Sequence, residues 1–78
     1  MRTVTVRQGK RYRATIALGW LEQLASNDMI ARQLEAAGFA EVSVTGSGHS
    51  REAEALWPGA DTSAQVPSQV SDVAEIEV

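Results

Sequence analysis

Residues 27–44, NDMIARQLEAAGFAEVSV, decide the fold because a helix pattern passes directly into a strand pattern within them. The first part carries apolar residues on one helical face at spacings of four and three: Ile30, Leu34 and Ala37. Gly38 follows where a C-terminal glycine cap belongs, and Phe39 can pack back on the helix. The pattern predicts a main helix from about residue 27 to residue 37.

Two further segments show the period of two that is typical of strands. Val42 and Val44 alternate with polar residues, and residues 46–49, GSGH, predict a turn after them. Residues 50–57 fit either a strand that buries Ala53, Ala55 and Trp57 or a helix built on alanine and glutamate. Because the two-glycine turn joins two alternating segments, we expect a strand there and keep the helix as the alternative.

The N-terminal residues 3–18 predict a β-hairpin. Two runs alternate apolar and polar residues, and Gly9 lies in a plausible turn between them. One face of this hairpin is apolar and the other is basic and rich in threonine. A short turn is expected over residues 20–25, after Gly19.

The rest of the chain is expected to be a connection and a last strand. Residues 60–72 are rich in Ser, Asp, Gln and Ala, and residues 73–78 alternate so that Ala74, Ile76 and Val78 face inward. The expected fold is α+β: a small antiparallel sheet of four to five strands with one main helix packed on one face, in a ββαβββ-like order. The expected core consists of Val4, Val6, Tyr12, Ala14, Ile16, Leu18, Leu21, Leu24, Ile30, Leu34, Phe39, Val42, Val44, Trp57 and Ile76.

Length and composition limit the class of protein. The chain has 78 residues, which predicts a single domain over 1–78, and it contains no cysteine, which excludes disulfides and thiolate metal sites. The absence of disulfides favours a reducing compartment. Arginines precede any apolar run at the N-terminus, and the longest uncharged apolar stretch has eight residues, 14–21. We therefore expect a soluble, cytoplasmic protein without a signal peptide.

The basic side of the predicted hairpin is the first candidate site. Arg7, Lys10, Arg11 and Arg13 carry the positive charge of a chain whose net charge is −3. Such a cluster can contact phosphates of nucleic acid or another anion. The competing interpretation is that Glu75 and Glu77 of the last strand lie opposite Arg11 and Arg13 and neutralise them.

The glycine-rich loop after the third strand is the second candidate. Gly46, Gly48, His49 and Arg51 lie in the run GSGHSR, where two glycines let backbone amides converge on an anion. The run fits neither a phosphate-binding P-loop nor a nucleophile elbow. A plain hairpin turn is the alternative.

Trp57, before Pro58 and Gly59, is the third candidate, either as a cap on the core or as an exposed anchor for a partner. Hydrolase chemistry would need an orienting partner for His49, the single histidine, and no such pattern appears. The carboxylates form no metal-binding spacing. We therefore expect no enzyme, no cofactor and no metal site.

The run from Asp28 to Val44 resembles the helix and strand of sporulation-related repeat domains, which are small modules that bind cell-wall glycans. The resemblance covers about 17 residues. The sequence departs from that family by opening with a predicted hairpin and by lacking a second helix, so no site residue follows from it.

The expected function is that of a non-catalytic interaction or structural module, an accessory part of a larger assembly. Its partner is expected to be another protein, with self-association through a sheet edge as one form of this, and the first and last strands are the natural edges. The alternative is anion or nucleic-acid binding through the basic N-terminal hairpin and the 46–51 loop.

Overall fold

A computed structural model describes residues 2–19 and 24–76. The elements in chain order are β1 (Arg2–Val6), β2 (Arg11–Ala17), α1 (Asn27–Ala36), β3 (Ala40–Ser47), β4 (Ser50–Leu56), β5 (Thr62–Val66) and β6 (Val70–Ile76). Four strands form an antiparallel sheet in the order β3-β4-β2-β6, and β1 and β5 form a two-stranded antiparallel sheet. The expected α+β class with one main helix on one face of an antiparallel sheet is confirmed.

Helix α1 begins and ends where its sequence signals predict. The Ser26 hydroxyl accepts a hydrogen bond from the Met29 amide at 3.1 Å, which satisfies one of the free amides of the first turn. At the other end Gly38 has φ +113°, and the Phe39 amide donates to the Leu34 carbonyl at 3.2 Å. Ile30 and Leu34 are buried, as predicted. No helix of the described residues is long and apolar enough to cross a membrane.

Strands β3 and β4 form the predicted hairpin, and the helical alternative for residues 50–57 is wrong. Gly48 has φ +68° in the two-residue turn between them, a position where glycine is favoured. Ala53, Ala55 and Trp57 are buried, whereas Glu52 faces solvent. The alternation of alanine and glutamate in β4 therefore separates a core face from an outer face.

The predicted hairpin of residues 3–18 is wrong in its pairing, although both of its strands exist. Strand β1 pairs with β5, and β2 pairs with β4 and β6 on its two sides. The turn at Gly9 is bonded elsewhere: its amide donates to the Trp57 carbonyl at 2.8 Å, and the Trp57 amide donates to the Lys10 carbonyl at 3.0 Å. These bonds hold the turn beside the end of β4, where the chain crosses from one sheet to the other.

The connection expected over residues 60–72 contains a strand and the start of another. Within β5, Ala64 and Val66 are buried and alternate with exposed residues, and β6 begins at Val70. Because the residues around Ala64 and Val66 are small or polar, the sequence did not show this alternation clearly. The turn predicted over residues 20–25 falls largely on residues 20–23, which lie outside the described part of the chain, as do Leu21, Glu77 and Val78.

Two expected core positions, Leu24 and Ile76, are wrong, and so is the inward orientation expected of Ala74. Leu24 is 84% exposed because helix α1 starts only after Ser26, so Leu24 does not share the stripe of Ile30 and Leu34. Ala74 and Ile76 lie on the outer face of β6, opposite Arg13 and Arg11 of β2. The cause is a bulge: Thr15 pairs with Asp72 and Ile16 with Val70, which leaves Ser71 as an extra residue.

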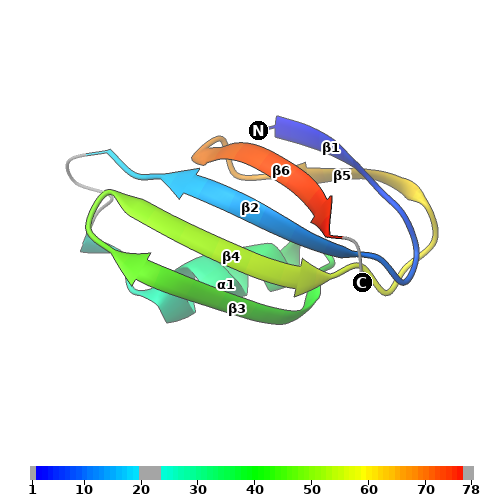
Figure 1. Ribbon diagram of the computed structural model, residues 1–78, viewed down its shortest axis with the longest axis horizontal. Helices are drawn as coiled ribbons and strands as arrows, with labels where there is room; N and C mark the ends of the chain where they lie inside the picture. Colours follow the sequence, from blue (N-terminus) through cyan, green and yellow to red (C-terminus); the bar gives the residue numbers. More distant parts are fainter. Residues whose placement is uncertain (1, 20–23, 77–78) are drawn as a thin grey trace.

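The core lies between the four-stranded sheet and a second layer made of α1 and the β1–β5 pair. Figure 1 shows α1 behind β3 and β4, and β5 behind β6. Buried residues from both layers form one cluster: Val6, Tyr12, Ile16, Ile30, Leu34, Phe39, Ala53, Ala55, Trp57, Ala64, Val66 and Val70. The opposite face of the four-stranded sheet has no layer over it within the described residues (Figure 1).

Replacing Leu34 with alanine is expected to lower the free energy of unfolding by about 2–5 kcal/mol, because Leu34 is 5% exposed in the middle of this cluster. Urea denaturation followed by circular dichroism measures the change. Arg32→Ala, on the exposed side of the same helix, is the control and should change stability by less than about 0.5 kcal/mol. A Leu34→Ala protein that unfolds like the wild type would show that α1 packs through another face.

Candidate functional site

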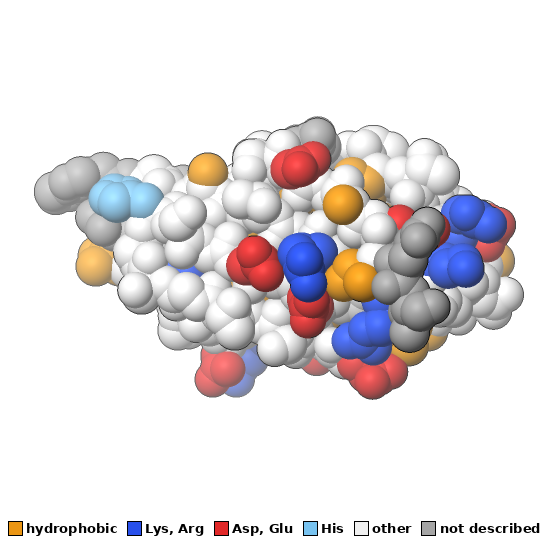
Figure 2. Space-filling model, viewed as in Figure 1, with side chains coloured by type: hydrophobic (Ala, Val, Ile, Leu, Met, Phe, Trp, Pro, Cys, Tyr) orange, Lys and Arg blue, Asp and Glu red, His pale blue; other side chains and the backbone are white. Residues whose placement is uncertain are grey.

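The basic side chains of β2 lie on the uncovered sheet face beside acidic side chains of neighbouring strands. The Arg13 Nη2 atom lies 2.8 Å from Glu54 Oε1, and Arg13 Nε lies 3.5 Å from Glu52 Oε1. Arg11 Nη1 lies 3.7 Å from Glu41 Oε1. The hydrogen bond and negative charge of Glu54 raise the pKa of Arg13 above its ordinary value. Figure 2 shows basic and acidic side chains interspersed on this face rather than a continuous basic stripe.

The neutralising partners come from strands other than the predicted one. Arg11 and Arg13 have their acids on β3 and β4, whereas Glu75 of β6 lies 3.8 Å from Arg7 Nη1. No carboxylate pairs with Lys10 among residues 2–19 and 24–76. Three of the four cations in the predicted anion site therefore already have carboxylate neighbours.

In the second candidate, the run from Gly46 to Arg51, hydrogen bonds of the buried Arg51 and of Asn27 hold the loop in place. Arg51 is only 6% exposed, and its Nη1 atom donates to Asn27 Oδ1 at 2.7 Å. Its Nε atom donates to the Gly48 carbonyl at 3.2 Å, and Asn27 Nδ2 donates to the Gly46 carbonyl at 3.2 Å. Arg51 thus ties the β3–β4 turn to the start of α1, on the face opposite to Arg11 and Arg13.

His49 and Trp57 also lie apart from the basic face. The exposed His49 ring is 3.2 Å from the Leu18 carbonyl through Nδ1, at the far end of β2. Trp57 is 7% exposed, its ring meets the ring of Phe39 edge to face at 5.0 Å, and its Nε1 atom donates to the Ala60 carbonyl at 2.9 Å. Trp57 is therefore a core residue, and the structure does not gather the nine predicted site residues into one place.

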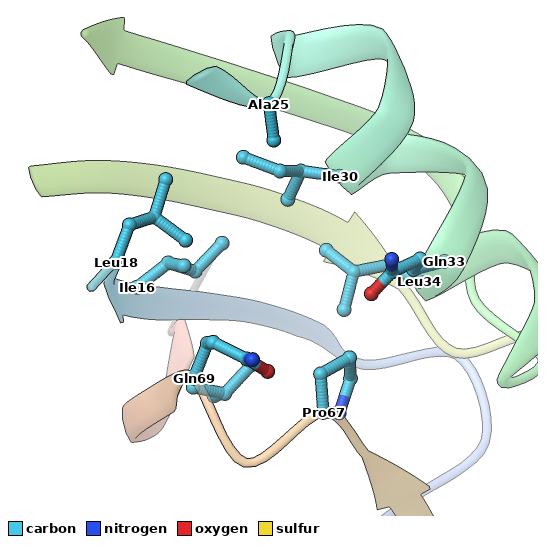
Figure 3. A pocket seen from close by; sticks show the side chains of 9 residues that line it. Ile16, Leu18, Ala25, Ile30, Gln33, Leu34, Pro67 and Gln69 are labelled. Atoms are coloured by element: carbon cyan, nitrogen blue, oxygen red, sulfur yellow. The ribbon is translucent and has the colours of Figure 1, made fainter. Parts of the chain in front are cut away.

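An apolar pocket of about 130 Å³ opens between α1, the end of β2 and the turn before β6 (Figure 3). Ile16, Ile30 and Leu34 form its apolar wall, and the side chains of Gln33 and Gln69 stand at its polar rim. It is smaller than the roughly 300–1,000 Å³ of typical small-molecule sites. Leu18 and Ala25, which flank the undescribed residues 20–23, both line it, so we assign no ligand to it.

A second cleft, of about 280 Å³, is lined by residues of β1 and β6, two strands that do not pair with each other. Its lining consists of Thr3, Val4, Thr5, Arg7, Tyr12, Val73 and Glu75. Among the described strands β1 pairs only with β5, and β6 pairs only with β2. Strand β1, and β6 from Asp72 to Ile76, therefore each have one edge that no described strand pairs with.

The ring of Tyr12 is buried, and its hydroxyl lies at the cleft, where it bonds to a residue from each side. The hydroxyl accepts a hydrogen bond from the Arg7 amide at 2.7 Å and donates to Glu75 Oε1 at 3.3 Å. Arg7 and Glu75 lie at the rim, and their side chains are 59% and 33% exposed. The cleft thus has a fixed polar end and an apolar middle formed by Val4 and Val73.

The other strand edges are less suited to accepting a partner. Strand β3 carries a bulge, where Glu41, with φ +50°, and Val42 stand opposite the single residue Ala55 of β4, and none of its residues lines either cleft. Strand β5 shares an open hollow of about 480 Å³ with α1, and Pro67, which has no amide hydrogen, follows β5 directly. The hollow contains no charged residue among those that line it. Two free strand edges, those of β1 and β6, border the same cleft.

Glu75 and Val73 are site residues that were not predicted, because the expected alternation of residues 73–78 turned the other face of β6 inward. The spacing of three between Val70 and Val73 breaks the strand period of two and is the available signal for the bulge at Ser71. Thr3 and Thr5 carried no signal beyond belonging to a strand. Among the described residues no group of three His, Asp or Glu side chains is placed to hold a metal ion.

The fold and cleft define a small two-layer α+β domain with one open side. Comparison with protein-family models, with curated proteins and with solved structures finds no match for the chain. The resemblance of residues 28–44 to sporulation-related repeat domains is therefore not supported by a family match.

Proposed function

We propose that this protein is a non-catalytic interaction module that accepts an extended segment of another protein along the free edge of β6. The observation that carries the proposal is the position of two unpaired strand edges on either side of one cleft. A segment that adds to β6 extends the four-stranded sheet by main-chain hydrogen bonds, and its inward side chains enter the cleft.

The size of the cleft fits this mode of binding. A volume of about 280 Å³ lies just below the range of small-molecule sites, but it accommodates one or two side chains of a peptide. Strand β6 has five residues in continuous register with β2, from Asp72 to Ile76, which is a typical strand length and gives a partner a straight template.

The anion-binding alternative is less well supported. Arg7, Arg11 and Arg13 each have a carboxylate within 3.8 Å, and Arg51 is buried on the other side of the sheet. A phosphate ligand would have to displace these carboxylates, and phosphate binding should fall steeply with added salt.

Selection from a displayed library of random peptides of about ten residues tests the proposal. Enriched peptides are then added to isotope-labelled protein, and amide exchange is recorded by NMR. We expect slower exchange at amides of β6 and shifts in β1 and β6, with β3, the other edge of the same sheet, unchanged as an internal control. An absence of enriched peptides, or protection at β3 without β6, would contradict the proposal.

A further inference from the structure

We infer that the segment accepted by β6 is basic and carries the pattern base, any residue, apolar residue, base. The inference rests on the proposed function and adds the chemistry of the partner. It follows from the charge and the two faces of the free edge.

The free edge carries negative charge. Residues 70–76 contain Asp72 and Glu75 and no basic residue. Asp72 is exposed and has no cationic partner among the described residues. A partner strand that places a base directly opposite each acid gains two favourable cross-strand pairs.

Glu75 has room for a second cation. Its Oε1 atom accepts from the Tyr12 hydroxyl at 3.3 Å and lies 3.8 Å from Arg7, beyond hydrogen-bond length, and it has no other partner in the described part of the chain. A carboxylate offers about four acceptor positions, so most remain unused. Tyr12 and Arg7 hold the carboxylate of Glu75 at the rim, and its remaining acceptor positions are open to a base of the partner.

The two faces of β6 fix the spacing of the pattern. Val73 and Glu75 face the cleft, as does Tyr12, which pairs with Glu75, whereas Asp72 and Ala74 face the uncovered side. In an antiparallel partner, the residue opposite Glu75 comes first and the residue opposite Val73 comes two positions later. The residue opposite Asp72 follows directly, and this order gives base, any, apolar, base.

A second copy of this chain is a poorer occupant. Strand β6 contains no basic residue that a second copy could place opposite Asp72 or Glu75, so pairing of β6 with β6 adds no favourable charge pair and brings two acidic edges together. Charge complementarity therefore favours a basic segment of a different protein.

The probe is a capped peptide with the sequence Thr-Val-Arg-Thr-Ile-Lys-Thr, and its neutral counterpart carries Gln in place of Arg and Lys. We expect the basic peptide to bind about fivefold more tightly than the neutral one, because it adds two cross-strand charge pairs. Affinity is measured from amide shifts of β6 in titrations at low salt.

A protein with Asp72→Asn and Glu75→Gln is expected to lose this preference. The control protein carries Glu35→Gln and Glu52→Gln, which change the net charge equally but lie on α1 and on the uncovered face of β4. The control should keep the preference to within about twofold.

The outcomes separate the two proposals. Equal binding of both peptides at β6, enriched library peptides without the basic pattern, or equal losses in both variants would overturn the inference and leave the proposed function standing. Failure of both probes and of every library peptide to bind at β6 would overturn the proposed function itself. Dimers of the free protein that protect β6 would show a second copy as the occupant and overturn the inference.

Discussion

Replacing Trp57 with alanine is expected to lower the free energy of unfolding by about 3–5 kcal/mol. The indole is 7% exposed, packs edge to face on Phe39 and donates its N–H to the Ala60 carbonyl. A domain of 78 residues is stable by roughly 4–12 kcal/mol, so the substitution should remove from about a quarter of this stability to all of it.

Chemical denaturation followed by circular dichroism measures this effect. Trp57→Phe keeps an aromatic ring in the same place but loses the bond to Ala60, and it should cost only about 1–2 kcal/mol. Wild-type stability of the alanine variant would contradict burial of Trp57. It would instead favour the interpretation of Trp57 as an exposed anchor for a partner.

Replacing Gly38 with alanine is expected to cost about 2–4 kcal/mol, for two reasons that can be separated. The φ angle of +113° is strained for any residue with a Cβ atom. An added Cβ would also lie 2.8 Å from Cη2 and 2.9 Å from Cζ3 of Trp57, which overpacks the core. The glycine that caps α1 therefore also makes room for the main aromatic residue of the core.

Gly9→Ala is the matched control for the backbone effect. Gly9 has φ +78° and nothing within 4 Å of an added Cβ, so its substitution should show backbone strain alone, about 1–2 kcal/mol. In a background that carries Trp57→Ala, the cost of Gly38→Ala should fall toward that of Gly9→Ala, because the clashing ring is gone. Additive costs in the double variant would show that the two residues do not touch.

Local sequence signals predicted the local structure. The stripe of Ile30 and Leu34 and the glycine Gly38 each act within a few residues, and they fix the helix and its end. The glycine turn before β4 does the same for the hairpin. The predicted core residues of these elements, Ile30, Leu34 and Phe39, are buried.

The pairing of β1 could not be predicted because alternation specifies a buried face and not a partner. Val4 lies opposite Ala64, some sixty residues away, rather than beside the strand that follows it. The adjacent strands looked like a hairpin, and only the bonds between Gly9, Lys10 and Trp57 show why the chain crosses between layers instead.

The candidate site was missed for the same reason. Because β1 pairs with β5, the free edges of β1 and β6 border one cleft. The extra residue Ser71 turns Val73 and Glu75 toward that cleft. The neutralisation of Arg11 and Arg13 was anticipated as one of two interpretations, but the neutralising acids come from β3 and β4. Charge pairing across a sheet depends on strand order, which the sequence does not display.

Amide hydrogen exchange in the free protein tests the central claim most directly, because the claim requires an unpaired edge on β6. From Asp72 to Ile76, amides that point toward β2 should be protected, and the alternate amides that point toward the cleft should exchange rapidly. The amides of β2, which has a strand on each side, should be protected throughout. Uniform protection along β6 would show that its edge is already covered and would contradict the account.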